Sequence, residues 1–342
     1  MGVFAPDLAF DLGSSNTLVY AKRRNVVISE PTLVVASSSN RHIVRAVGDE
    51  ALSLLGRTTD TLVAIHPVKN GILDDFDSTE VLIRYFIRKA IGVSHLIGPK
   101  VLVAVPSNIP AVSRKALQEA FVVAGARKNG VYLVEKPLCA ALGANLPVGE
   151  PMGTMVVDIG GGTTDIAVLS MNGVVVSQSV PVGGNRMDEA IVSYLKKNSS
   201  MLIGIRTAEQ VKIDLGSAIP QKNLRSVKIR GRDLYSAHAM DVEFTSAQAY
   251  EALKEPCAAI LAGIKWVLER TPPELARDII REGIHLTGGG GQLFGLEKYI
   301  GDQVGILTQL SFNPAERTIS GLGTLLDHED LLSAIIRKNS ND

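Results

Sequence analysis

Two aspartates, each near the end of an apolar run and each followed by a glycine-rich turn, have the clearest chemistry in this sequence. Asp11 precedes the turn 13–16, and Asp158 precedes the turn 160–163. Glycine allows positive φ and lets backbone N–H groups approach an anion closely. A carboxylate beside such an anion cradle is a hard-oxygen partner for Mg²⁺, usually through waters that the ion retains. The pattern therefore predicts phosphate binding, with Asp11 and Asp158 holding Mg²⁺ through water.

A third glycine cluster, at 288–291, follows another short apolar run. One glycine-rich turn alone is more often an ordinary hairpin. Two matched copies and a third cluster favour a nucleotide clamp instead. None has the G-x-x-x-x-G-K-[ST] pattern, so the site is not a P-loop. The predicted nucleotide-binding residues of the three turns are Gly13, Ser14, Ser15, Asn16, Gly160, Gly161, Gly162, Thr163, Gly288, Gly289 and Gly290.

Short strands are the elements that must position these turns. Apolar residues 8–13 and 17–21 flank the first turn and predict a β-hairpin. Residues 155–160 and 165–169 flank the second turn in the same way. One construction present in each half of the chain predicts a duplicated α/β architecture with a site between the halves.

Further strands and helices alternate along the chain. The pattern predicts strands at 100–105, 131–134 and 284–287, and a helix at 112–126. Thr207 and Gln210 have capping-box spacing, which predicts the start of a short helix. Residues 246–270 have a helical pattern that Pro256 is expected to kink or restart.

The composition limits the class of protein. The 342 residues suffice for two average domains or one large two-lobed unit. The 35 basic and 35 acidic residues leave no electrostatic footprint for nucleic acid, and the lack of net charge tolerates self-association. Cys139 and Cys257 are too few for a disulfide framework, which favours a reducing compartment. With neither a membrane-length apolar run nor a signal-peptide pattern, we expect a cytoplasmic protein.

Several segments together resemble the bacterial actin family of MreB and Mbl. The matching segments are 11–20 with 29–31 (first phosphate loop), 158–164 (second phosphate loop), 182–191, 216–220 and 286–290 (adenosine loop). They follow the order of the family from about residue 8 to about residue 325. The resemblance implies an α/β, actin-like fold of two lobes, each with an RNase-H-like core, and a cleft between them that holds ATP and Mg²⁺.

The resemblance also implies domain boundaries and polymerisation. Lobe I is expected at 1–140 with 316–342, including a small subdomain around 31–66. Lobe II is expected at 141–315, with a small subdomain around 184–245. Subunits would assemble head to tail into filaments that take part in cell-shape determination.

Two residues of the short helix expected to start at Thr207 are candidates for the nucleoside contact. Glu209 and Lys212 match the family positions that make it, and their spacing puts them on one helix face. A solvent-exposed Glu–Lys pair is the alternative interpretation.

The sequence departs from the family at Lys136. The family has Glu-Glu-Pro where this chain has Glu135-Lys136-Pro137, and the replaced glutamate is the one thought to position or deprotonate the attacking water. An ammonium has three donors and no acceptor, so it cannot take that proton. Glu135 and Asp75, a family carboxylate of the same pocket, are the remaining catalytic candidates. The hypothesis is an ATP-binding protein with slow hydrolysis, a weak ATPase at most.

Relatives bind the inner membrane through a short N-terminal segment and a hydrophobic loop. The matching apolar residues here are Val3, Phe4, Leu96 and Ile97, with ordinary packing as the alternative. The expected location is therefore cytoplasmic and peripheral at the inner face of the cell membrane. Expected partners are further copies of the chain, cell-shape or wall-synthesis membrane proteins and the membrane surface, and not nucleic acid. Helix 112–126 matches one that pairs protofilaments in relatives, or it is simply solvated.

Other functions share the actin-like fold, so the fold alone does not fix the function. A non-polymerising ATP-binding regulator is the second hypothesis, and a small-molecule kinase is a further one. A kinase needs a catalytic aspartate in the cleft, for which Asp75 is the candidate. A chaperone ATPase needs a separate peptide-binding domain, which this sequence does not extend far enough to hold.

Overall fold

The computed structural model describes residues 5–22, 26–55, 61–92 and 96–339. The chain divides into two compact units, which are described separately. Unit 1 comprises Met1–Met152, Leu169–Ser177 and Glu316–Asp342, and unit 2 comprises Gly153–Val168 and Gln178–Ala315. No helix among the described residues has both the length and the apolar character needed to cross a bilayer.

A five-stranded sheet forms the centre of unit 1. Its order is β10 (Val131–Glu135), β9 (Val101–Val105), β1 (Leu8–Leu12), β2 (Asn16–Ala21) and β3 (Val26–Pro31). Strands β1, β9 and β10 are parallel, while β2 and β3 continue the sheet antiparallel. Every residue of β9 is buried, as expected of a strand covered on both faces. The predicted hairpin around the first turn is confirmed.

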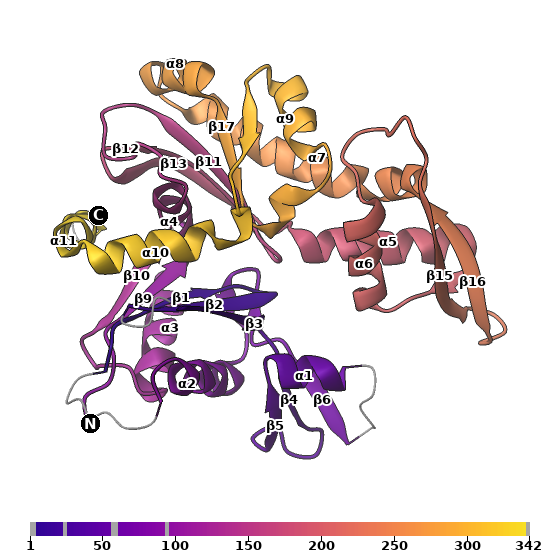
Figure 1. Ribbon diagram of the computed structural model, residues 1–342, viewed down its shortest axis with the longest axis horizontal. Coiled ribbons are helices and arrows are strands. Elements are labelled where there is room, and N and C mark those ends of the chain that lie inside the picture. Colours follow the sequence, from indigo (N-terminus) through magenta and orange to yellow (C-terminus); the bar gives the residue numbers. More distant parts are fainter. Residues whose placement is uncertain (1–4, 23–25, 56–60, 93–95, 340–342) are drawn as a thin grey trace. The chain divides into compact units, whose positions relative to one another are not determined.

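Helices cover both faces of this sheet (Figure 1). α2 (Phe76–Ile91) and α3 (Ala111–Val123) lie on one face, and α4 (Lys136–Gly143) and α10 (Arg317–Asp327) lie on the other. Phe10 of β1 meets Phe121 of α3 edge to face, with ring centroids 5.0 Å apart. The remaining elements of unit 1 are β4 (Val34–Ser37), β5 (Val44–Val47), α1 (Asp49–Leu54), β6 (Leu62–Ile65), β7 (Val68–Lys69), β8 (Ile72–Leu73) and α11 (Glu329–Asn339).

α4 and α10 cross with backbone against backbone. A Cβ added to Gly143 would lie 1.8 Å from the carbonyl oxygen of Arg317. A Cβ added to Gly321 would lie 1.8 Å from the carbonyl oxygen of Cys139. The Arg317 guanidinium also donates to the Gly143 carbonyl at 2.8 Å. Only glycine at these two positions allows the helices to come this close.

Unit 2 is built around a second five-stranded sheet. Its order is β13 (Gly173–Val180), β12 (Thr164–Ser170), β11 (Thr154–Ile159), β17 (Ile284–Thr287) and β18 (Thr308–Leu310). Strands β11, β17 and β18 are parallel, so their carboxyl ends lie at the same edge. The strands expected beside the second and third turns are therefore confirmed.

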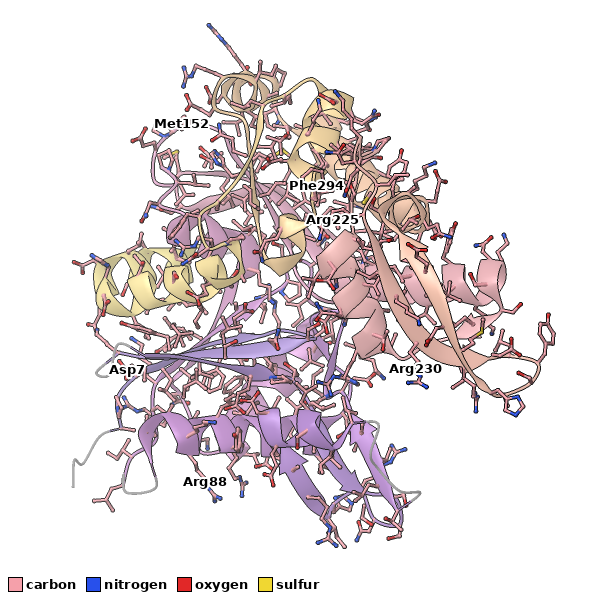
Figure 2. The ribbon with its side chains drawn as sticks, turned by 45° about the vertical axis from the view of Figure 1, so that its right-hand side comes forward. Asp7, Arg88, Met152, Arg225, Arg230 and Phe294 are labelled. Atoms are coloured by element: carbon pink, nitrogen blue, oxygen red, sulfur yellow. The ribbon has the colours of Figure 1, made fainter. Side chains whose placement is uncertain are left out.

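The helices and a long hairpin complete unit 2. They are α5 (Gly184–Ser199), β14 (Met201–Leu202), α6 (Ile205–Leu215), β15 (Ser226–Asp233), β16 (Ala239–Thr245), α7 (Ser246–Arg270), α8 (Pro273–Glu282), η1 (Gly289–Gln292), α9 (Leu296–Val304) and η2 (Pro314–Glu316). Figure 1 shows α5, α6 and the β15–β16 hairpin side by side. Arg230 lies on the exposed side of that hairpin (Figure 2).

The expected start of one helix is wrong, and a second helix does not restart where expected. The predicted capping box at Thr207 and Gln210 lies inside α6, which starts after the extended N-cap Gly204. Gln210 instead donates to Asp214, one turn further on, at 3.0 Å. A capping box does occur at Thr245, where its side chain accepts from the N–H of Gln248 and starts α7.

α7 continues through Pro256 and does not restart there. Proline removes one backbone donor from the helix. However, Pro256 is itself buried together with Leu253, Cys257 and Ile260, so packing of this face helps to keep the helix continuous. Tertiary packing therefore outweighs the local preference of proline.

Candidate functional site

The first glycine-rich turn closes tightly between β1 and β2. The N–H of Gly13 donates to the carbonyl oxygen of Asn16 at 3.1 Å. A Cβ on Gly13 would lie 2.6 Å from that same oxygen, so no other residue fits without a shift. Thr32, the residue after β3, holds the turn in place. Its hydroxyl donates to the Gly13 carbonyl at 2.6 Å and its N–H donates to the Ser15 carbonyl at 2.8 Å.

The second turn repeats this closure in unit 2. The N–H of Gly160 donates to the carbonyl oxygen of Thr163 at 2.8 Å. The N-terminus of α5 packs against the turn, with the N–H of Gly184 donating to the Gly160 carbonyl at 3.0 Å and that of Asn185 to the Gly161 carbonyl at 2.8 Å. The predicted duplication of strand, aspartate, turn and strand is thus present in the hydrogen bonds as well as in the sequence.

The third glycine cluster lies directly against the strand that carries the second turn. A Cβ on Gly288, whose φ is 78°, would lie 2.3 Å from the carbonyl oxygen of Ile159 at the end of β11. A Cβ on Gly290 would lie 2.5 Å from the Ile159 side chain. A Cβ on Gly289, by contrast, would meet nothing within 4 Å. Unit 2 therefore brings two of the three predicted loops to one edge of its sheet.

Asp158 is a buried carboxylate between these two loops. It is 6% exposed and pairs in register with Thr287 of β17. The Thr287 hydroxyl donates to Oδ1 of Asp158 at 2.9 Å. Beyond the second turn, the Thr163 hydroxyl donates to Asp165 at 3.0 Å. Hydrogen bonds from neutral hydroxyls thus help to fix both carboxylates in place.

Asp11, the counterpart in unit 1, has a cation as its neighbour. The ammonium of Lys136 lies 2.8 Å from Oδ1 of Asp11, and the two side chains are only 9% and 13% exposed. The register explains the reach, since Asp11 and Val134 are both level with Ala104 of the intervening strand β9. Neighbouring strands are about 4.8 Å apart, so an extended lysine from the end of β10 spans the distance to β1.

The two aspartates consequently differ as partners for Mg²⁺. Asp158 fits a water-mediated site, because it is a hard oxygen donor that the Thr287 hydroxyl holds at the end of β11, beside two glycine-rich loops. Asp11 does not fit as a free acceptor, because an ammonium already occupies one of its oxygens. Among the described residues, no three His, Cys, Asp or Glu side chains gather closely enough to hold a metal directly.

The other predicted catalytic residues have structural positions in unit 1. Asp75 is the N-cap of α2, and its Oδ1 accepts from the N–H of Ser78 at 2.7 Å. The segment before it touches the first loop, since the N–H of Gly71 donates to the Ser14 hydroxyl at 3.1 Å. Glu135 is the N-cap residue of α4 but its side chain makes no capping bond. Lys136 is the first residue of that helix, where a positive charge is disfavoured by the helix dipole.

Glu209 and Lys212 have different environments on α6. Glu209 is exposed, whereas Lys212 turns to the start of α5. Its ammonium lies 2.9 Å from Asp188 and donates to the Gly184 carbonyl at 3.1 Å. Burial raises the pKa of Asp188 to about 6, even though Lys212 pulls it the other way. Sequence reasoning missed two neighbours of predicted site residues: Asp188, 2% exposed, beside Lys212, and the neutral Thr287 beside Asp158.

The apolar residues expected at a membrane lie partly outside the described residues. Val3 and Phe4 belong to that undescribed part. Leu96 is 88% exposed, and Ile97 is half-buried. The N–H of Ala5, the residue after Phe4, donates to the Ile97 carbonyl at 3.1 Å. Ala5 is thus hydrogen-bonded to the loop that contains Leu96 and Ile97.

Surface hollows of unit 1 and unit 2 lie away from the glycine-rich loops. One of about 630 Å³ runs along α2 and is lined by Arg84, Tyr85 and Lys89 among others. Arg88, also in its lining, is exposed on α2 (Figure 2). A second, of about 220 Å³, lies between α7 and α9. Neither is lined by a predicted site residue.

Each unit has a glycine-rich turn of the same construction, and in unit 2 a third glycine cluster follows the neighbouring strand β17. This combination is typical of an actin-like protein. The crystal structure of MreB5 of Spiroplasma citri bound to ADP shares this fold with a TM-score of 0.90 and 31% identity, covering 97% of this chain and 98% of that one. The family model described as MreB/Mbl protein matches residues 5–334. The chain therefore belongs to the MreB/Mbl family.

Curated relatives agree with this assignment. The cell shape-determining protein Mbl of Bacillus cereus is 42% identical over 330 residues, which is 96% of this chain and 98% of the relative. The cell shape-determining protein MreB of Escherichia coli is 42% identical over 334 residues, which is 96% of each chain. The actin-like fold and the family expected from the sequence motifs are confirmed.

Proposed function

We propose that this protein is an ATP-binding, cell-shape-determining cytoskeletal protein that assembles into filaments. The observation that carries the proposal is the identical closure of the two turns, Gly13 to Asn16 and Gly160 to Thr163, each beside a buried or half-buried aspartate. Such turns direct backbone amides at an anion. Solved structures of the Spiroplasma citri relative with ADP and with AMPPNP support a nucleotide as the ligand. The names of the Mbl and MreB relatives support the role in cell shape.

Nucleotide hydrolysis is slow in this proposal. Lys136 replaces the family glutamate, and its ammonium, held by Asp11, offers no acceptor for a proton from water. General-base assistance contributes on the order of 10²–10⁴-fold to such a reaction. When bound, Mg²⁺ supplies charge neutralisation at the phosphates, and Asp158 with its Thr287 partner is the carboxylate that would hold it through water.

Phosphate release by the wild type and by Lys136→Glu tests the slow step. The variant is expected to release phosphate about 100-fold faster or more, the lower end of the range for a general base. Equal or slower release by a folded Lys136→Glu variant contradicts the assignment. A Glu135→Gln variant, which alters the adjacent carboxylate, shows whether that residue is the base instead.

Membrane association is the second part of the proposal. Leu96 is exposed, and the Ala5–Ile97 hydrogen bond brings the N-terminal segment to the same loop. One subunit offers few apolar side chains and therefore binds a bilayer weakly. A filament presents many copies of them at once and binds more strongly. Co-sedimentation of polymerised protein with liposomes is expected to fall when Leu96 and Ile97 are made polar. Met171→Asn, at a 63% exposed apolar position of unit 1, is the matched control and is expected to pellet like the wild type.

Light scattering with ATP separates the proposal from its alternative, a non-polymerising ATP-binding regulator. A filament former scatters light after addition of ATP, in a manner that depends on protein concentration. Nucleotide binding without any rise in scattering across concentrations favours the regulator. Stimulation of ADP production by a small hydroxylated substrate favours a kinase.

A further inference from the structure

We propose that Lys212 is a positioning residue of the nucleotide site, which holds the second glycine-rich turn in the form that presents its backbone N–H groups to a phosphate. This inference rests on the proposed function, because the ligand of the turn is taken to be a nucleotide. It gives Lys212 a different role from the nucleoside contact expected from the sequence, since the lysine acts through the backbone of α5.

The ammonium of Lys212 is held at the start of α5, beside which α6 lies (Figure 1). It lies 2.9 Å from Asp188 and donates to the carbonyl oxygen of Gly184 at 3.1 Å. Gly184 and Asp188 are four residues apart and share one face of the helix, which allows a single ammonium to reach both. The side chains of Lys212 and Asp188 are 15% and 3% exposed, so water competes little for these contacts.

One peptide group connects this contact to the second turn. The Gly184 carbonyl that accepts from Lys212 belongs to the same peptide group as the N–H of Asn185, and that N–H donates to the Gly161 carbonyl at 2.8 Å. A donor at the carbonyl of a peptide group polarises it and strengthens the hydrogen bond that its N–H donates. The N–H of Gly184 donates to the Gly160 carbonyl at 3.0 Å. The start of α5 therefore holds two successive carbonyls of the turn.

The directions of these two carbonyls determine the directions of the next two N–H groups. The peptide bonds here are trans, and in a planar trans peptide the carbonyl and the N–H point to opposite sides. Because the carbonyls of Gly160 and Gly161 point to α5, the N–H groups of Gly161 and Gly162 point away from it. Successive N–H groups that point to one side of a turn form a concave site for an anion. All three glycines are half-buried and so retain accessible surface, whereas Thr163 is buried.

Loss of Lys212 should therefore affect the phosphate end of a ligand. Without the ammonium, the peptide group between Gly184 and Asn185 loses the charged donor at its carbonyl. The bound phosphate must then order the turn itself, and this ordering lowers the free energy of binding that remains. A ligand without phosphate makes no use of the turn and is not affected. This difference separates a positioning role from a direct contact with the nucleoside.

Competition of ADP and of adenosine with a fluorescent ATP analogue, in excess Mg²⁺, tests the inference. In the wild type, ADP is expected to bind more tightly than adenosine. The double variant Asp188→Asn with Lys212→Met removes both charges without leaving one buried alone. It is expected to bind ADP on the order of 10-fold more weakly, the size of one hydrogen bond to a charged group, while its Kd for adenosine stays within about 2-fold of the wild type.

Three further variants test whether the charged donor is responsible. Lys212→Arg keeps a cation for the Gly184 carbonyl and should retain most of the ADP affinity. Lys212→Gln keeps a neutral donor and is the milder variant if the double variant does not fold; its ADP affinity should lie below that of Lys212→Arg. Lys298→Met removes a lysine from an exposed pair with Asp302 on α9 and should leave both Kd values unchanged.

The possible results are distinguishable. Equal weakening of ADP and adenosine binding in the double variant assigns Lys212 to the nucleoside and overturns the inference. Unchanged Kd values for both ligands also overturn it, because the pair with Asp188 would then serve the fold alone. A wild type that does not bind the ATP analogue contradicts the proposed function itself.

Discussion

Thr287 and Asp158 face each other across the two central parallel strands of unit 2, with the threonine hydroxyl donating to the carboxylate at 2.9 Å. Thr287 is fully buried and Asp158 is 6% exposed, so no bulk water replaces this bond if the hydroxyl is lost. The pair also joins the strand before the second glycine turn to the strand before the third. One side chain thus fixes both the carboxylate and the spacing of two loops.

Thr287→Val is expected to lower the free energy of unfolding by about 1.5–3 kcal/mol, the range for a hydrogen bond to a charged group. Valine has nearly the shape of threonine, so the loss reports the hydroxyl and not a cavity. Urea unfolding monitored by circular dichroism measures it. Thr287→Ser keeps the hydroxyl and should retain more of the stability; equal loss in both variants would assign the effect to packing.

Lys136→Ala is expected to destabilise the protein by about 3–5 kcal/mol, because it leaves the carboxylate of Asp11 buried without its partner. Lys22→Ala provides the comparison. Its pair with Asp327 is more exposed, at 34% and 49%, and should cost about 1 kcal/mol or less. Thermal unfolding of both variants in the absence of nucleotide gives the two values. Similar losses would mean that the Lys136 pair is as well solvated as a surface pair.

Asp188 is expected to make stability depend on pH. Burial raises its pKa from 3.8 to about 6, so the folded chain binds this proton more tightly than the unfolded chain. The unfolded state therefore holds fewer protons between these values, and the contribution of Asp188 to the free energy of unfolding falls as the pH rises from about 4 to about 6. Below about pH 4 this contribution is fully present.

Asp188→Asn removes the titrating carboxyl group and with it this pH-dependent contribution to stability. Between about pH 4 and pH 6 the free energy of unfolding of the wild type is expected to fall by up to about 3 kcal/mol through Asp188, since each pKa unit corresponds to about 1.4 kcal/mol. The variant should not show this fall. Urea titrations at several pH values between these limits measure the difference between the two proteins. Parallel curves for wild type and variant would show that Lys212 keeps the Asp188 pKa near its ordinary value.

Gly143→Ala and Gly321→Ala are each expected to destabilise unit 1 by about 1–3 kcal/mol or more, because the new methyl group meets backbone that cannot rotate away. The added Cβ would start 1.8 Å from a carbonyl oxygen in both cases. Gly204→Ala, where nothing lies within 4 Å of an added Cβ, is the control and should change stability by less than about 1 kcal/mol. Equal effects at all three positions would indicate backbone entropy and not the crossing of the helices.

The turns and strands of the candidate site were predictable, because glycine clusters and short apolar runs are local signals. Loop closures such as that of Gly160 follow directly from such signals. The partner of Lys136 was not predictable, since it depends on the order of three parallel strands and on the level at which Asp11 and Val134 meet. A single sequence does not contain this register in any local pattern.

Packing between elements also explains other differences between the sequence-based predictions and the structure. Asp188 lies in a segment recognised only as a family motif, and its burial against Lys212 depends on how α5 and α6 pack. Local capping chemistry pointed to Thr207, yet α6 starts earlier, at Ile205, after an extended glycine. Pro256 follows the same rule, because its buried neighbours keep α7 continuous. The roles of Asp75, Glu135 and Glu209 in nucleotide chemistry stay predictions.

The crossing of α4 and α10 has a mechanical consequence. Where backbone touches backbone at Gly143 and Gly321, there are no side-chain rotamers to absorb a small displacement. A displacement of α10 is therefore expected to move α4 with it, and with α4 its first residue, Lys136. The ammonium that pairs with Asp11 is in this way mechanically coupled to a helix some 180 residues further along the chain.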